Sequence, residues 1–134
     1  MSPLTGLCRV AGMRFAQETP EGNTISACAA GEITINEEVI RESVVIIHER
    51  IIRDWLPARF EELEVAHLVR LLELGPEIIV LGTGETLRFP APEIMASALT
   101  QGIGVEVMDT SAACRTYNIL HSEGRQVVVA LLLG

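Results

Sequence analysis

The sequence predicts a single α/β domain in which strands come first and a β-α-β-α-β series follows. Its 134 residues are enough for one hydrophobic core and too few for two. Hydrophobic residues make up 49% of the chain and charged residues 21%, which is typical of a globular protein and not of a disordered one. Apolar residues have strand spacing before Trp55, and strands alternate with helices after it.

The first half reads as strands joined by short turns. A lead-in of 24 residues without periodicity ends at the turn Pro20 to Asn23, and Met13 is a candidate for the true start. Strands are expected at 25–29, 32–40 and 44–47. Ile33 and Ile35 alternate with polar residues, which predicts one buried and one wet face. The unbroken apolar run 44–47 predicts a strand that is buried on both faces of the sheet.

The second half alternates between helix and strand. Apolar residues recur with helical spacing after Pro57. The predicted helix ends at Gly75 and Pro76, because these residues terminate helices. Strands are expected at 77–81, 104–108 and 127–133, and helices at 90–101 and from about 110 to 122. The stripe of the first helix is Phe60, Leu63, His67, Leu68, Leu71 and Leu72, and the inner face of the second is Ile94, Met95, Ala98 and Leu99.

The charge of the chain excludes several functions. All ten basic residues are arginine, so no lysine is available for a Schiff base or a phosphate-binding P-loop. The net charge of −8 repels nucleic acid and anionic lipid, and the glutamates are most simply a solvated face. We therefore expect no nucleic-acid partner.

The cysteines and histidines predict neither a disulfide framework nor a metal site. Three widely spaced cysteines without a Cys-x-x-Cys pair fit a reducing cytoplasm. His48, His67 and His121 lack ligand spacing, and His67 is expected to be packed and hydrogen-bonded. The start of the chain lacks signal-peptide features and no apolar run is long enough to span a bilayer, so a soluble cytoplasmic protein without a cofactor is expected.

Two turns that follow strands hold candidate binding residues. Gly82, Thr83 and Gly84 could present backbone amides to an anion or a carboxylate, or they could simply turn the chain. They lack the dinucleotide fingerprint, and Glu85 opposes an anion. Asp109 and Thr110 are adequately explained as helix caps, with a catalytic role for Asp109 as the alternative.

The helix that follows Asp109 carries further polar groups. Cys114 in its first turn is either a reactive thiolate or, as we prefer, a small core residue. Arg115, Tyr117 and Asn118 could form a recognition surface or fasten the helix to neighbouring loops. All three cannot point the same way, because successive side chains on a helix diverge by about 100°.

The amino-acid sequence from Gly102 to Gly134 resembles that of a known family. Gly104 to Thr110, Ala112 to Leu120 and Glu123 to Arg125 carry the likeness, with Leu81 to Gly84 and Pro92–Glu93 in support. The chain resembles the small single-domain family that includes mitochondrial respiratory complex I (NADH:ubiquinone oxidoreductase) assembly factor 3 and many bacterial and archaeal relatives. The likeness covers residues 13–134, which implies one globular domain after a weakly ordered extension at 1–12.

The resemblance implies a three-layer α/β sandwich around a mixed sheet with about three helices. It brings no settled chemistry; the mitochondrial branch acts by binding partner proteins, and the targeting peptide of that branch is absent, which favours a bacterial-type relative. The leading hypothesis is a non-enzymatic protein-interaction module that binds through Gly82 to Gly84 and Asp109 to Asn118. The alternative is a small-molecule binder or minor enzyme using a cleft near Asp109 and Cys114. An early edge strand could also pair two copies into a homo-oligomer.

Overall fold

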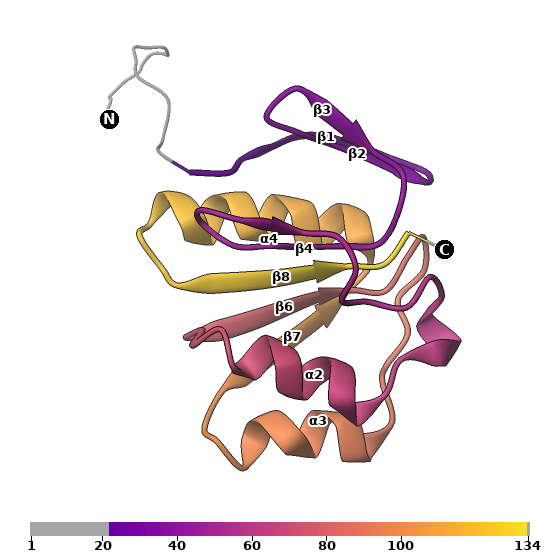
Figure 1. Cartoon of the computed structure of the whole chain (residues 1–134), viewed down its shortest axis with the longest axis vertical. Helices are drawn as coiled ribbons and strands as arrows, with labels where there is room; N and C mark the ends of the chain where they lie inside the picture. The colour runs from indigo at the N-terminus through magenta and orange to yellow at the C-terminus, as the bar shows by residue number, and fades with distance from the viewer. Residues whose placement is uncertain (1–21, 134) are drawn as a thin grey trace.

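A computed structural model describes residues 22–133 of the chain (Figure 1). The early strands are β1 (Ile25–Ala29), β2 (Glu32–Ile35), β3 (Glu38–Ile40), β4 (Val44–Ile46) and β5 (Ile51–Ile52). They are followed by the 3-10 helix η1 (Phe60–Glu62), α2 (Val65–Leu72), β6 (Ile78–Gly82), α3 (Pro92–Leu99), β7 (Gly104–Met108), α4 (Thr110–Ser122) and β8 (Val127–Leu131).

The described strands form two sheets. β1, β2 and β3 make an antiparallel sheet of their own, and the other five follow the order β5-β4-β8-β6-β7. β6 is parallel to both of its neighbours, with Val80 opposite Glu106 of β7 and Val129 of β8. β4 runs antiparallel to β8 and β5 antiparallel to β4, so the larger sheet is mixed.

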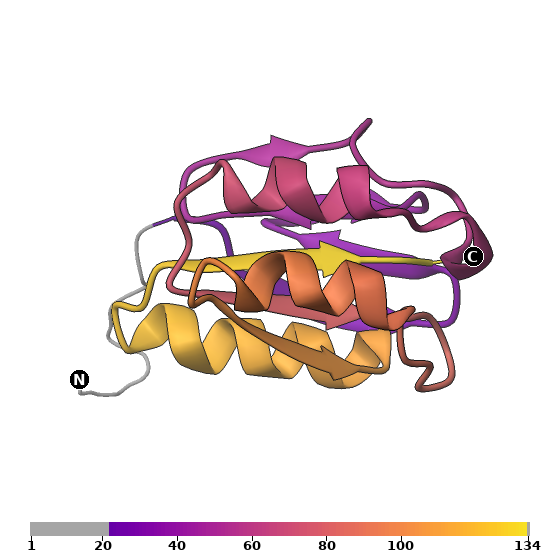
Figure 2. The same ribbon diagram turned by 90° about the horizontal axis from the view of Figure 1, so that it is seen from below.

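The larger sheet is covered on both faces. α2 and α3 lie against one face, and α4 with the three-stranded sheet lies against the other (Figures 1 and 2). Two apolar clusters fill the spaces between these layers, one containing Tyr117 and the isoleucines of β1 and β2, the other containing Leu71 and Ala98. β8 contributes to both clusters because its alternate side chains face opposite layers.

This architecture confirms the predicted α/β fold: strands come first, then β-α-β-α-β, with three α-helices among residues 22–133. The predicted strand 104–108 matches β7, and the predicted end of the third helix at Ser122 matches α4. Ile33 and Ile35 are fully buried on alternate positions, and Val44, Val45 and Ile46 are buried on both faces, as their patterns predict.

Three expectations about elements were wrong. The strand expected at 32–40 is broken by a turn at Asn36 and Glu37, whose φ angles of 51° and 76° are left-handed. The first helix does not begin at Phe60, because Glu64 is extended and starts α2 as its N-cap. Leu99 is 71% exposed and does not belong to the inner face of α3, which buries Ile94 and Ala98 instead.

Asn23 belongs to the fold and not to an unordered lead-in. Its side-chain amide donates to the carbonyls of Ile47 and Arg50, and its backbone N–H donates to His48. Its side-chain oxygen accepts from the amide of Asn36 at 2.7 Å. Met13, the extension 1–12 and Pro20 lie outside the described residues.

Candidate functional site

The two predicted turns meet at the carboxyl edge of β6 and β7. The backbone N–H of Gly84 donates to Thr110 Oγ1 and the backbone N–H of Thr110 donates to the carbonyl of Gly84, both at 2.9 Å. Thr110 Oγ1 in turn donates to the carbonyl of Leu132 at 2.7 Å. The amides that could have held an anion are therefore engaged within the fold, and they lock α4 to the end of the sheet.

Gly82 is required by the close approach of α4. A Cβ at this position would lie 3.0 Å from Thr110 Cα and 3.1 Å from Ala113 Cβ. The absence of a side chain thus lets the first turn of α4 rest directly on β6.

Thr83 holds the loop that follows β6. It is 1% exposed, and its hydroxyl donates to the carbonyl of Thr86 at 2.7 Å and accepts the backbone N–H of Arg88 at 3.1 Å. This loop carries Leu87, 51% exposed, and Phe89, 71% exposed. Two large apolar side chains therefore project into solvent from a loop with a hydrogen-bonded base.

The same loop is tied to η1 by Arg88. The Arg88 guanidinium donates to Glu61 Oε2 at 2.6 Å and lies over the ring of Phe60, 5.3 Å from its centroid. The hydrogen bond from Arg88 lowers the pKa of the Glu61 carboxyl. Because both partners are exposed, this contact orients the loop more than it stabilises the fold.

Asp109 caps α4, as its position after a strand suggests. Its carboxylate accepts the backbone N–H of Ala112 at 2.9 Å. It faces solvent in part and lines a surface hollow together with Gly84, Glu85 and Ser111.

Tyr117 and Asn118 fasten α4 to the start of the first sheet. Tyr117 is fully buried, and its hydroxyl donates to the carbonyl of Asn23 at 2.9 Å. The amide of Asn118 pairs with both backbone groups of Ile25, accepting from the N–H at 3.0 Å and donating to the carbonyl at 2.6 Å. Arg115 points elsewhere: it is exposed and donates to Ser111 Oγ at 3.0 Å. The three side chains thus diverge, as helix geometry requires.

Cys114 is a core residue with a protonated thiol. It is buried under the three-stranded sheet, and burial raises the pKa of its thiol well above the ordinary range, with a further contribution from the thiol of Cys28. The nearby Arg115 lowers the pKa less than these effects raise it. A thiolate nucleophile at neutral pH has no support in this environment.

The hollows around the candidate residues are small and open. One of about 330 Å³ is lined by Asp109, Thr110 and Gly84, and one of about 280 Å³ by Arg115, Cys114 and Asn118. They share Cys28 and Ser111 as lining residues, and Thr83 lines neither. Thus neither hollow joins Thr83, Asp109 and Arg115. A pocket lined by all three residues would have indicated a small-molecule site.

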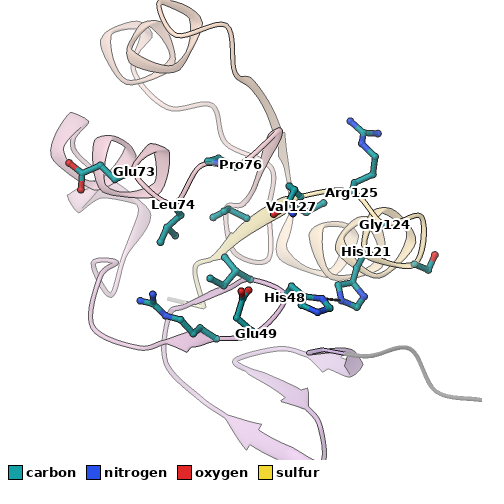
Figure 3. A pocket seen from close by; sticks show the side chains of 14 residues that line it. His48, Glu49, Glu73, Leu74, Pro76, His121, Gly124, Arg125 and Val127 are labelled. Atoms are coloured by element: carbon teal, nitrogen blue, oxygen red, sulfur yellow. Dashed lines mark hydrogen bonds between the residues drawn. The ribbon is translucent and has the colours of Figure 1, made fainter.

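A larger cavity lies at the opposite edge of the sheet, where the sequence predicted no site. It measures about 710 Å³ and contains His48, from the turn after β4, and His121, from the last turn of α4 (Figure 3). His48 Nδ1 lies 2.9 Å from His121 Nε2. The two histidines are 73 positions apart, so no local spacing could reveal the pair. His67, by contrast, accepts the backbone N–H of Glu64 and completes the cap of α2.

No helix within residues 22–133 has the length and apolar character needed to cross a membrane.

Comparison with known proteins assigns the chain to a family of small α/β domains. The family described as protein of unknown function (DUF498/DUF598) matches residues 25–132, and the chain belongs to it. Its relatives include the NADH dehydrogenase [ubiquinone] 1 alpha subcomplex assembly factor 3 of Xenopus tropicalis, 29% identical over 121 residues that cover 89% of this chain and 66% of that protein. The resemblance drawn from Gly102 to Gly134 is thereby confirmed.

A bacterial relative carries a different name. The "13 kDa major membrane protein" of Francisella tularensis subsp. holarctica is 39% identical over 67 residues, which cover 50% of this chain and 54% of that protein. The chain thus spans between about half and two thirds of the length of these curated relatives.

Solved structures share the fold. A crystal structure of a Bordetella parapertussis protein matches with a TM-score of 0.78 and 38% identity, covering 87% of this chain and 98% of that one. The solution structure of a Mth938-like domain from Bordetella pertussis matches with a TM-score of 0.77 and 30% identity, covering 90% and 92%.

Proposed function

We propose that the protein is a non-enzymatic interaction module that binds another protein at the carboxyl edge of its larger sheet. The contact surface comprises the loop 85–89, the half-buried N-cap Asp109, and the exposed Ser111 and Arg115 of α4. Gly82, Thr83, Gly84 and Thr110 support this surface from below, whereas Tyr117 and Asn118 lie farther along α4 and fasten it to Asn23 and Ile25. Homology to assembly factor 3 proteins suggests an assembly or interaction role.

The observation that carries the proposal is the exposure of Leu87 and Phe89 on a loop with a buried anchor. Aromatic and aliphatic side chains that project from a pre-ordered loop are typical anchors of protein interfaces. Thr83 and Arg88 hold this loop at both its base and its side, so ordering it on binding costs little entropy. Glu85 and Asp109, which line one surface hollow with Ser111, add polar groups of the kind found at the rim of an interface.

The chemistry of the site supports binding over reaction. The Asp109 carboxylate already caps α4, and the Cys114 thiol is buried and protonated. A general base or nucleophile needs a reactive atom that is free to meet a substrate, whereas the Asp109 carboxylate is engaged by the Ala112 N–H and the Cys114 thiol is buried.

The test compares two variants in which exposed apolar side chains at opposite edges of the sheet are replaced by serine. Tagged wild-type protein, the double variant Leu87→Ser/Phe89→Ser and the control Leu99→Ser are each used for affinity capture from the source cell, followed by quantitative mass spectrometry. Leu99 is as exposed as Phe89 but lies at the far end of α3. We expect a protein recovered with wild type and Leu99→Ser and reduced about tenfold or more with the double variant.

Equal recovery with both variants would contradict the assigned surface. A metabolite that co-purifies in stoichiometric amount while no protein is recovered would favour the alternative, a small-molecule binder or minor enzyme near Asp109 and Cys114.

The cellular location and the oligomeric state of the protein are further predictions of the proposal. A cytoplasmic place fits the free thiols of Cys28 and Cys114, and cell fractionation tests it, since one relative is named a membrane protein. Pairing of two copies through β3, an edge strand of the smaller sheet, is tested by sedimentation of the purified protein.

A further inference from the structure

We propose that His48 and His121 form a bidentate site for a divalent transition-metal ion at the mouth of the 710 Å³ cavity (Figure 3). This inference is independent of the proposed interaction surface, which lies at the other edge of the sheet. It rests on the distance between two ring nitrogens, on the packing that holds the rings, and on the open space beside them.

The distance suits shared coordination. Imidazole nitrogens bind such ions at about 2.0–2.1 Å. Two nitrogens 2.9 Å apart then subtend an angle of about 90° at the ion, which is the cis angle of tetragonal nickel and copper complexes. A tetrahedral zinc ion needs a separation only about 0.4 Å wider, which a small rotation of the exposed His48 ring supplies.

The two rings are already stacked side by side before any ion binds. His121 stacks on His48 with ring centroids 5.0 Å apart and on Tyr117 with centroids 5.4 Å apart. His48 is backed by Gly22, where an added Cβ would lie 2.5 Å from His48 Nδ1, and its carbonyl accepts the N–H of Asn23. Such packing lowers the entropy lost when both rings bind one ion.

The hydrogen bond between the two rings identifies the nitrogens that an ion would use. In the free protein one ring donates its N–H to the other. On binding, that proton moves to the other nitrogen of the same ring, and the rings turn so that the two lone pairs, which face each other in the hydrogen bond, converge on the ion.

The remaining coordination positions face the cavity. Within residues 22–133 no three His, Cys, Asp or Glu side chains gather to hold an ion, so this part of the chain supplies the two histidines and leaves the other positions to water. Glu49 and Glu73 line the same cavity with Arg50 and Arg125, and Arg125 is engaged by Glu77 at 2.9 Å. An ion bound by two protein ligands keeps positions open for an exchangeable ligand.

The experiment is calorimetric titration of the full chain with Zn²⁺ and Ni²⁺, with Mg²⁺ as the hard-ion comparison. The variants are His48→Gln and His121→Gln, and His67→Gln is the control because His67 is remote and only caps α2. We expect one Zn²⁺ or Ni²⁺ per chain, unchanged in His67→Gln, weakened about 10-fold to 100-fold in each of the other variants, and no Mg²⁺ binding.

Absence of a one-to-one site in the wild type would overturn the proposal, as would equal affinity in His48→Gln. Because the His48 side chain is exposed, His48→Gln decides the question even if His121→Gln fails to fold. Near-ultraviolet circular dichroism, recorded on each variant, verifies the fold.

Discussion

At the scale of single residues, α4 uses its buried polar side chains to anchor the first strands. Tyr117 reaches Asn23, and Asn118 pairs with Ile25, more than ninety positions earlier in the chain. These contacts close a long loop with hydrogen bonds whose partners are buried, so removing one partner leaves an unsatisfied group.

The Tyr117→Phe substitution tests this anchor. The ring keeps its packing, but the Asn23 carbonyl loses its donor, and we expect the free energy of unfolding to fall by about 1 kcal/mol. Urea denaturation measures the change, with an unchanged m-value as the sign that the native fold persists. An unaltered midpoint would mean that the hydrogen bond does not contribute.

The same residue predicts a pH dependence in alkali. Burial raises the pKa of Tyr117 from 10.0 to about 12. Since the folded state holds this proton more tightly than the unfolded state, the stabilisation is present below pH 10 and is lost as the pH rises towards 12. Tyr117 is the single tyrosine, so tyrosinate absorbance reports it alone.

The control for the alkaline prediction is the difference in the free energy of unfolding between wild type and Tyr117→Phe, measured from pH 10 to about pH 12. The difference should narrow as the pH rises above 10. A tyrosinate transition centred at the ordinary value of 10 in folded protein would contradict the burial of the hydroxyl.

Alanine substitutions at Gly82 and Gly104 form a matched pair that tests the close contact between α4 and the sheet. Gly82→Ala places a methyl group 3.0 Å from Thr110, and we expect it to destabilise the protein by about 1–3 kcal/mol. Gly104→Ala meets nothing within 4 Å and should change the stability by less than about 0.5 kcal/mol. Thermal and urea unfolding compare the two variants, and equal effects would refute the close approach.

Individual site residues were only partly predictable. The sequence suggested capping for Asp109 and core packing for Cys114, and both have local causes in the first turn of a helix. Nothing local connects His48 with His121, or Tyr117 with Asn23, because those contacts depend on how the layers pack. The exposure of Leu87 and Phe89 likewise depends on Thr83, whose hydrogen bonds draw the base of the loop inward.

At the scale of elements, α4 owes its start to Asp109. Asp109→Ala removes the acceptor of the Ala112 N–H and the negative charge at the helix N-terminus, and we expect a loss of about 1 kcal/mol. Asp109→Ser keeps an acceptor oxygen and should recover most of this loss. If both variants unfolded at the same urea concentration, the capping contact would not account for the role of Asp109.

Elements with strong periodicity were predictable and weakly marked boundaries were not. β7 and α4 were expected within a residue of their ends because caps and glycines mark them. The turn at Asn36 and Glu37 was missed because its second left-handed position is a glutamate and not the usual glycine. The break at Glu64 was missed because its cap is made by His67, an uncommon partner for that role.

At the scale of the whole molecule, the larger sheet is the most protected unit. β8 is buried along its full length and pairs with β4 and β6, whereas β5 has two residues and lies at an edge. We expect backbone amides of β8 and β6 to exchange slowest with deuterium and those of β5 and β3 fastest. Faster exchange in β8 than in β5 would contradict the arrangement of layers.

The interaction role rests on the loop 85–89 making direct contact with a partner protein in the cell. Site-specific incorporation of a photo-cross-linking amino acid at position 89, and separately at position 99, tests this most directly. The account predicts a defined covalent adduct with one protein from position 89 and none from position 99. Adducts from both positions alike, or from 99 alone, would contradict it.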